Sequence, residues 1–425
     1  MHEISRAHGA DSSHDPMDHW HEPTDTFKRA GSGTFVRPPR PYDLFMQEQA
    51  IPIVRDFGVS KVQDLPLKPW PRMDGRGTFI QLFGTEGLWG MYVVEVPGRG
   101  ALKVEKHLYE ELFLVIEGRG TTEVWPEGGQ KHVFEWQRGS MFAIPLNAYH
   151  RIVNASSAPT LLLVGTTAPN AINLYANNDF VFNNAFVFRD RFDNAKDYFK
   201  ENEAITPEPV MGRAMRRTNF IPDVVNCDLP LDNRRSPGYR RIEPHFAGNQ
   251  FYLFIGQHET GRYSKAHAHA SAAVLICLRG KGYTYTWPSA LGLRPFSNGH
   301  RDKVVRVDYE PVGMVSAAPM SGDWFHQHFG VSKEPLRLTA WIGPNASYGG
   351  FALAGGAPGT LVTDEGSNDI SEGGKSIPYD EEDPFIRADY EAALRAAGAS
   401  SRMEDWLYRK PQEGERRASN EFIGA

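Results

Sequence analysis

The feature that most constrains the fold of this chain is an internal repeat. Residues 105–128 (EKHLYEELFLVIEGRGTTEVWPEG) align without gaps with residues 267–290 (HAHASAAVLICLRGKGYTYTWPSA), at a shift of 162 positions. A repeat of this size indicates two similar domains built on one pattern. The shift places like residues on each other: His107 on His269, Gly118 on Gly280, Gly120 on Gly282, Trp125 on Trp287 and Pro126 on Pro288.

Further along, the two copies match again at a shift of 174, which places Gly139 on Gly313 and Pro145 on Pro319. The second copy therefore carries about 12 additional residues, around 292–302 (GLRPFSNGHRD). Each copy reads as short apolar runs separated by turns, which is typical of strands in a sandwich or barrel. In the first copy these runs are LWGMYVVEVP, ELFLVIEG, GTTEVWP, KHVFEW, GSMFAIP, HRIVNA and TLLLVGTT.

The predicted fold is therefore all-β, with two barrels and few helices. We expect an N-terminal arm at 1–75, a first barrel at 76–170, a connector at 171–240, a second barrel at 241–350 and a C-terminal extension at 351–425. A helical portion is expected in the connector near residues 190–205. A second helix is expected in DPFIRADYEAALRAAG, where Asp383 is the cap, Pro384 begins the helix and Gly398 ends it.

Composition limits the partners of the chain. A net charge of −6 and a pI near 6.2 argue against nucleic-acid binding. The chain contains no run of 18 apolar residues, so a membrane span is not expected. The two cysteines, Cys227 and Cys277, rule out a disulfide framework and a cysteine-based zinc site. With no secretory signal recognisable at the N-terminus, we expect a cytoplasmic protein.

Histidines in the second copy are spaced for metal binding. His267 and His269 stand at i and i+2 on a predicted strand, so both imidazoles face the same side. A third imidazole can come from WFHQHF, which offers His326 and His328. At Ala273, where the repeat would place a fourth ligand, the side chain has no donor atom.

The first copy carries carboxylates as well as imidazoles. Glu105, His107 and Glu111 share one strand parity and so face the same barrel interior, and His150 follows on a later strand. Glu110 has the opposite parity and is expected to point outward. Two interpretations stay open for this set: a site for Mn(II), Fe(II) or Zn(II), or a hydrogen-bonded Glu–His cluster without metal.

These spacings resemble the two-part signature of the cupin superfamily, G-x5-H-x-H-x(3,4)-E-x6-G followed by G-x5-P-x-G-x2-H-x3-N. The first copy departs from it at Glu105, where a histidine is usual, and at Asn147, where a glycine is usual. In the second copy, His326-x3-Gly330 keeps the closing spacing of the motif. The resemblance implies a bicupin with two jelly-roll barrels. It implies His267, His269 and His326 as ligands, with His328 beside the metal as a proton-transfer residue.

The missing carboxylate has a chemical meaning. Three neutral imidazoles leave a divalent metal its full charge and open positions, as in non-haem Fe(II) centres that bind substrate and O2 side by side. HAHASAAVLICLRGKGYT with WFHQHF resembles the metal barrel of gentisate and salicylate dioxygenases, which carry three histidines and an alanine in the glutamate position. Those enzymes usually place this site in the first barrel, whereas here it falls in the second.

The sequence therefore predicts an Fe(II) dioxygenase that oxidises or ring-cleaves a small aromatic or other chelating substrate with O2. A redox-neutral metal-dependent lyase, isomerase or decarboxylase is the alternative, and a non-catalytic ligand-binding bicupin is the second alternative. Oxalate decarboxylase-like bicupins are disfavoured, because they resemble one another in carrying the full His-x-His-x3-Glu set in both barrels. Resemblance to bicupins also implies a homo-oligomer.

Overall fold

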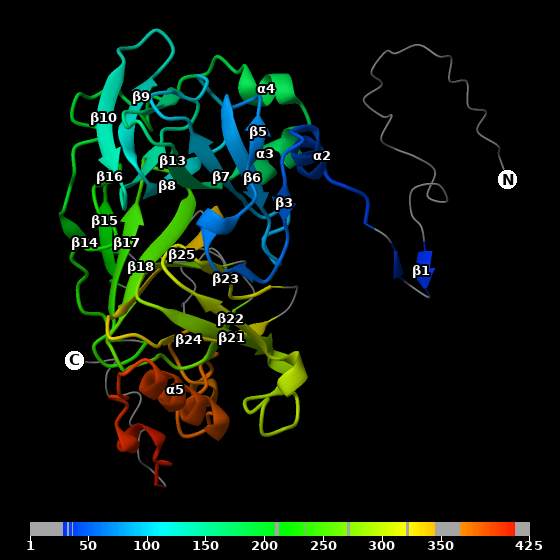
Figure 1. Cartoon of the computed structure of the whole chain (residues 1–425), viewed down its shortest axis with the longest axis vertical. Helices are drawn as coiled ribbons and strands as arrows, with labels where there is room; N and C mark the ends of the chain where they lie inside the picture. The colour runs from blue at the N-terminus through cyan, green and yellow to red at the C-terminus, as the bar shows by residue number, and fades with distance from the viewer. Residues whose placement is uncertain are drawn as a thin grey trace, which may run out of the picture.

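The computed structural model describes residues 29–31, 34–35, 37–208, 212–233, 235–269, 273–319, 323–344 and 366–412. It confirms the all-β fold with two barrels, which lie one against the other (Figure 1). The C-terminal extension packs on the second barrel, at the end of the molecule away from the first. No helix among the described residues is long and apolar enough to cross a membrane.

The first barrel consists of a large and a small sheet that face each other. In the large sheet the strand order is β11-β8-β13-β7-β6, and in the small sheet it is β10-β9-β12. All seven strand segments predicted for the first copy are strands. Their bounds, with β6 added, are β6 (Gly75–Ile80), β7 (Gly90–Val96), β8 (Glu111–Glu117), β9 (Arg119–Trp125), β10 (His132–Gln137), β11 (Met141–Ile144), β12 (Tyr149–Asn154) and β13 (Thr160–Thr166).

The second barrel repeats this order. Its large sheet runs β17-β18-β25-β20-β23, and its small sheet runs β19-β24-β21-β22. The additional residues of the second copy lie between β21 and β22 and include the short 3-10 helices η2 (Ser289–Leu291) and η3 (Arg301–Lys303). The strands are β17 (Arg240–His245), β18 (Phe251–His258), β19 (His267–His269), β20 (Val274–Arg279), β21 (Gly282–Pro288), β22 (Val305–Tyr309), β23 (Met314–Ser316), β24 (Trp324–Gly330) and β25 (Leu336–Pro344).

Segments outside the two barrels complete the sheets. In the arm, β3 (Ile53–Val54) and β5 (Lys68–Trp70) pair with β6, and η1 (Val62–Asp64) follows β4. In the connector, β14 (Ile205–Pro207) pairs with β15 (Ala214–Arg217), which pairs with β17. Two strands near the N-terminus, β1 (Arg29–Gly31) and β2 (Thr34–Phe35), pair with each other in a separate sheet.

The two barrels also exchange edge strands. β4 (Gly58–Val59) precedes the first barrel but pairs with β23 of the second. β16 (Phe220–Ile221) precedes the second barrel but pairs with β11 of the first. The repeat shift of 162 residues places β4 on β16, so the repeat extends into the arm and the connector, further than the sequence comparison indicated.

Side-chain alternation divides the core into layers. Leu112 and Leu114 of β8 share one cluster with Val274 and Ile276 of β20, so this apolar layer joins the two large sheets. The residues of opposite parity fill the barrel interiors: Phe113 and Val115 in the first barrel, and Ala273, Leu275 and Cys277 in the second. The candidate ligand residues of the two barrels therefore lie on opposite sides of a shared apolar layer.

The helix predicted near residues 190–205 is wrong. That segment forms turns, and the connector helices are α3 (Ala168–Tyr175) and α4 (Asn178–Phe182) instead. Asn194 has a positive φ of 67°, which a continuous α-helix does not accommodate. Phe192 and Phe199 pack on the first barrel, where the ring of Phe199 stacks 4.2 Å from that of Phe134.

The C-terminal helix is confirmed as α5 (Pro384–Ala396). The Asp383 side chain accepts a hydrogen bond from the Phe385 amide, and Gly398 adopts a positive φ of 69° just past the end. The other helices are α2 (Pro41–Glu48) in the arm, and η5 (Ile370–Glu372) and η6 (Asp405–Tyr408) in the extension. The part of the predicted extension at 351–365, like residues 1–28 of the arm, lies outside the described residues.

Candidate functional sites in the two barrels

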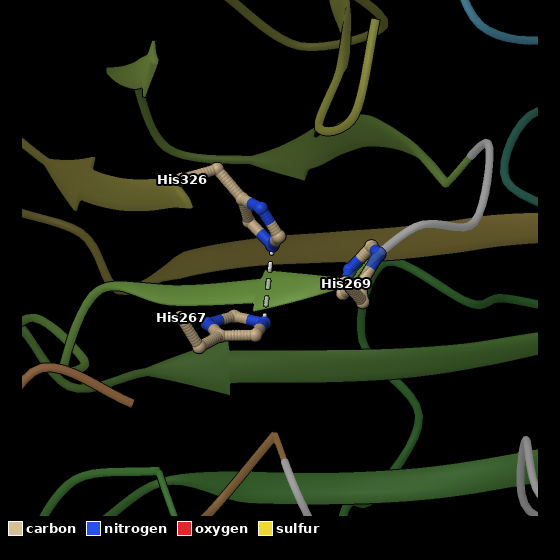
Figure 2. Close-up of side chains that lie close together, drawn as sticks. All are labelled: His267, His269 and His326. Atoms are coloured by element: carbon tan, nitrogen blue, oxygen red, sulfur yellow. Dashed lines mark hydrogen bonds between the residues drawn. The ribbon is translucent and has the colours of Figure 1, made fainter. Parts of the chain in front are cut away.

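Three histidines converge inside the second barrel. β19 pairs with β24 so that His267 lies directly opposite His326. His269 lies two residues further along β19, on the same face. The Nε2 atoms of His267 and His326 are 3.1 Å apart (Figure 2). One ring nitrogen from each of His267, His269 and His326 lies within 4.8 Å of the other two.

This geometry suits a divalent metal. Two imidazole nitrogens bound side by side to one ion are about 3 Å apart, because each lies about 2 Å from the metal. Burial, with a further contribution from neighbouring imidazoles and the Arg235 guanidinium, lowers the pKa of His267 and His326 well below the usual value. Both rings are therefore neutral, which is the form that binds metal. Within the described structure, Nδ1 of His267 has no hydrogen-bond partner.

His328 lies on the same inward face of β24 but outside the group of three. Its ring centroid is 5.4 Å from that of His326, and its Nδ1 is 2.7 Å from the Thr284 hydroxyl. Burial lowers the pKa of His328 well below its usual value. The structure thus brings His326 together with the histidine pair and leaves His328 beside them, with its ring neutral.

Two basic residues near this site were not predicted from the sequence. His258 ends β18, is buried, and has Nδ1 3.2 Å from the Ser264 hydroxyl. Arg235 comes from the connector and donates to the Gly366 carbonyl at 2.8 Å, and its charge contributes to lowering the pKa of His328. Because both residues lie outside the repeated motif, only the fold brings them to the site.

Ala273 holds the position that Glu111 has in the first barrel. Its side chain is almost fully buried and belongs to the apolar cluster that fills the second barrel, together with Ala317 and Leu275. The group of candidate ligands in this barrel consists of imidazoles alone. A metal bound here would keep its positive charge, because no carboxylate among the described residues belongs to the group.

The first barrel gathers two imidazoles and one carboxylate. Glu111 Oε2 lies 3.3 Å from His107 Nε2 and 3.7 Å from His150 Nε2, and Tyr92 donates to Glu111 Oε1 at 2.8 Å. Burial alone would raise the pKa of Glu111, but the two imidazoles and the Tyr92 hydroxyl lower it overall. Burial lowers the pKa of His150 to about 4. One carboxylate and two imidazoles form a donor set that suits a divalent metal.

Two buried atoms of this set point to the same conclusion. His107 Nε2 and Glu111 Oε2 have no partner of hydrogen-bond geometry in the described structure. Buried polar atoms are rarely left in this state, and a metal ion would satisfy both. Beside them is a cavity of about 20 Å³, whose lining includes Tyr92, Tyr109 and Arg72. That is room for about one water molecule.

Glu105 does not join the first-barrel group, although the sequence motif placed it there. Its carboxylate pairs with Arg72 at 2.6 Å, while its backbone pairs with that of His150. Arg72 follows β5 in the arm and also contacts the Tyr109 hydroxyl at 3.3 Å. The strand parity of Glu105 could be read from the sequence, but a cation supplied by the arm could not.

Glu110 leaves the barrel interior as expected, but it is buried rather than exposed. Its carboxylate accepts hydrogen bonds from the amides of Gln250 and Phe251, at the start of β18, at 2.8–2.9 Å. Arg191 of the connector lies 3.5 Å away. The residue next to Glu111 therefore ties the first barrel to the second.

The C-terminal extension backs the histidine strand of the second barrel. The Ala268 amide donates to the Lys375 carbonyl at 3.0 Å, and the Ile377 amide donates to the Ala266 carbonyl at 2.7 Å. Lys265 forms a buried ion pair with Asp369 at 2.5 Å. This segment therefore runs along the edge of β19 that β24 leaves open, and it fixes the backbone of two candidate ligands.

A buried carboxyl group joins the extension to β24. Glu382 accepts hydrogen bonds from the Tyr263 hydroxyl at 2.6 Å and from the Gln327 amide at 2.7 Å, and Gln327 lies between His326 and His328. Burial raises the pKa of Glu382 to about 7. The Arg387 charge lowers this pKa and the Asp383 charge raises it, and neither reverses the shift caused by burial.

We expect this group to make the protein less stable as pH rises from about 4.5 to about 7. The unfolded chain loses the Glu382 proton first, so the folded state binds more protons in this range and the free energy of unfolding falls. The size of the effect is on the order of 3 kcal/mol. Denaturant unfolding of E382Q and of the parent protein across this range should show a difference that changes with pH. A constant difference would contradict the assignment.

Comparisons with known proteins agree with a cupin domain in the first barrel. Residues 92–165 match the family model of the cupin domain. No curated protein matches the chain.

Solved structures that resemble this chain include oxalate decarboxylase of Bacillus subtilis, with 11% identity over 76% of this chain and 88% of the other, and a TM-score of 0.43. The 7S globulin of Momordica charantia has 14% identity over 66% of this chain and 81% of the other, at a TM-score of 0.40. Vicilin of Solanum lycopersicum has 10% identity over 69% of this chain and 86% of the other, also at a TM-score of 0.40. The assignment of two barrels rests on the strand order of this chain.

Proposed function

We propose that this chain is a metal-dependent dioxygenase that oxidises a small chelating substrate with O2 in its second barrel. The observation that carries the proposal is the convergence of His267, His269 and His326 with no carboxylate in the group. Such a set leaves a divalent metal its full charge, which favours an anionic, chelating substrate. A small hydroxylated aromatic acid has this chemistry.

Fe(II) is the metal we propose for this site, because it supplies the one-electron chemistry through which O2 reacts with an organic substrate. The three imidazoles would hold it. His328 would take the proton that a substrate hydroxyl loses on binding, since its ring lies beside the group of three histidines. His267, His326 and His328 are buried, and electrostatic interactions are stronger where bulk water is distant.

We also propose that the first barrel binds a second divalent metal through His107, Glu111 and His150. The two unsatisfied buried atoms support this proposal. The cavity beside them holds about one water molecule, which favours a very small substrate in this barrel. The second barrel is our candidate for the oxidation because its group of ligands consists of imidazoles.

Oxygen consumption tests the proposal. Protein loaded with Fe(II) under anaerobic conditions is mixed with hydroxylated aromatic acids such as gentisate and salicylate, and O2 uptake is followed with an electrode. We expect uptake with at least one of them, and both atoms of ¹⁸O2 in the product. A product that forms equally well without O2 would contradict a dioxygenase and would favour the redox-neutral alternative.

A further inference from the structure

A chain of hydrogen bonds leads away from His328 inside the second barrel. The Thr284 hydroxyl is 2.7 Å from His328 Nδ1 and 3.2 Å from the Tyr309 hydroxyl. The Tyr309 hydroxyl is in turn 3.1 Å from the Tyr283 carbonyl. Thr284 lies opposite His328 in the register of β21 and β24, and its side chain is fully buried. Water therefore does not compete for these contacts.

Only one arrangement of protons satisfies all three contacts. A carbonyl oxygen can only accept, so Tyr309 must donate its single hydroxyl proton to Tyr283. Tyr309 then accepts a hydrogen bond from Thr284, which donates its only hydroxyl proton in that bond. Thr284 can therefore only accept from the imidazole, so Nδ1 of His328 must carry a hydrogen.

We propose that Thr284 and Tyr309 are positioning residues that hold His328 in the Nδ1–H tautomer. The lone pair of the ring then stands on Nε2, so Nε2 is the atom that can accept a hydrogen bond from a substrate hydroxyl. The assignment of a tautomer follows from the hydrogen bonds alone, whereas its catalytic meaning rests on the proposed function. A wrong tautomer would present an N–H where the reaction needs a base.

The sharpest test changes a residue that does not touch His328. In Tyr309→Phe the hydroxyl of Thr284 loses its acceptor and becomes free to donate to His328 Nδ1. The stable tautomer of His328 should then be the Nε2–H form. Thr284→Val, which keeps the shape of the side chain but removes the hydroxyl, should leave a mixture of the two forms. Thr284→Ser keeps the hydroxyl and should retain the Nδ1–H form.

The measurement is the ¹⁵N spectrum of metal-free protein labelled at histidine, with His328→Gln used to assign the signals. A protonated ring nitrogen and one that carries a lone pair have well-separated ¹⁵N shifts. Thr286→Val is the matched control, because Thr286 lies on the same face of β21, opposite His326, and donates to the Ala317 carbonyl. It should leave the His328 signals unchanged.

The inference is overturned if His328 of the parent protein carries its hydrogen on Nε2, or if Tyr309→Phe leaves the Nδ1–H form in place. Should Tyr309→Phe not fold, the two Thr284 variants decide. The inference is then overturned if Thr284→Val keeps only the Nδ1–H form or if Thr284→Ser loses it. The spectrum needs neither metal nor substrate, so it separates this inference from the proposed function. If O2 uptake is found, Tyr309→Phe should lower kcat about tenfold or more with little change in KM.

Discussion

Glutamate in place of Ala273 is expected to lower O2 uptake in the second barrel about a hundredfold or more while the metal stays bound. The repeat places this residue where Glu111 stands in the first barrel, and Ala273 belongs to the interior cluster. A carboxylate there would cancel part of the metal charge and fill a position that the substrate needs. Several kcal/mol of binding and activation would be lost, so we expect a fall of about a hundredfold or more in kcat/KM.

Ala273→Gln is the control for the size of the new side chain. Both variants overpack the cluster, at a cost of about 1–3 kcal/mol in stability, but only the glutamate brings a negative charge. Metal content and O2 uptake are measured on both variants. If the glutamate variant binds metal and still consumes O2 like the parent protein, the empty position at Ala273 has no catalytic meaning.

The second large effect concerns the ion pair between Lys265 and Asp369. Both side chains are buried, at 5% and 0% exposure, and the pair lies next to β19. Lys265→Met would remove the Lys265 ammonium from a buried ion pair and leave the fully buried Asp369 carboxylate with less compensating charge. We expect the free energy of unfolding to fall by about 3–5 kcal/mol, measured by denaturant titration.

The chain offers a matched control for this experiment. Lys281 and Glu310 form an ion pair of the same length, 2.5 Å, but both side chains are more than half exposed. Lys281→Met should cost no more than about 1 kcal/mol. Adding Asp369→Asn to Lys265→Met should restore part of the lost stability, because the buried negative charge that Lys265 balanced is removed as well. Equal losses in Lys265→Met and Lys281→Met would show that the buried pair does not hold the extension to β19.

Much of the fold could be predicted because the repeat and the strand pattern are local signals. Alternation places His267 and His269 on one face, and the same rule separates Glu111 from Glu110. The register between β19 and β24 then determines that His326 meets the pair. The face of each residue follows from strand geometry and the choice of His326 from the motif spacing, so a single sequence contains both.

The errors and omissions arise where distant segments meet. Glu105 pairs with Arg72 of the arm, and the aromatic rings of residues 190–205 pack on the first barrel instead of forming a helix. Arg235 reaches the second barrel from the connector, and Lys375 pairs with β19 from the C-terminal extension. Each contact joins residues far apart in the chain, and no periodic pattern marks either partner.

The most direct test of the central claim is a metal analysis that separates the two barrels. Protein is loaded with Fe(II) without oxygen, and iron is measured in the parent protein, in H267A/H269A and in H107A/H150A. Nitric oxide, a probe for Fe(II) with an open position, is added, and its electron paramagnetic resonance signal is recorded. We predict that H267A/H269A loses this signal and its share of the iron, and that H107A/H150A keeps the signal. A signal that survives in H267A/H269A and disappears in H107A/H150A would place the oxygen-reactive centre in the first barrel and contradict the proposal.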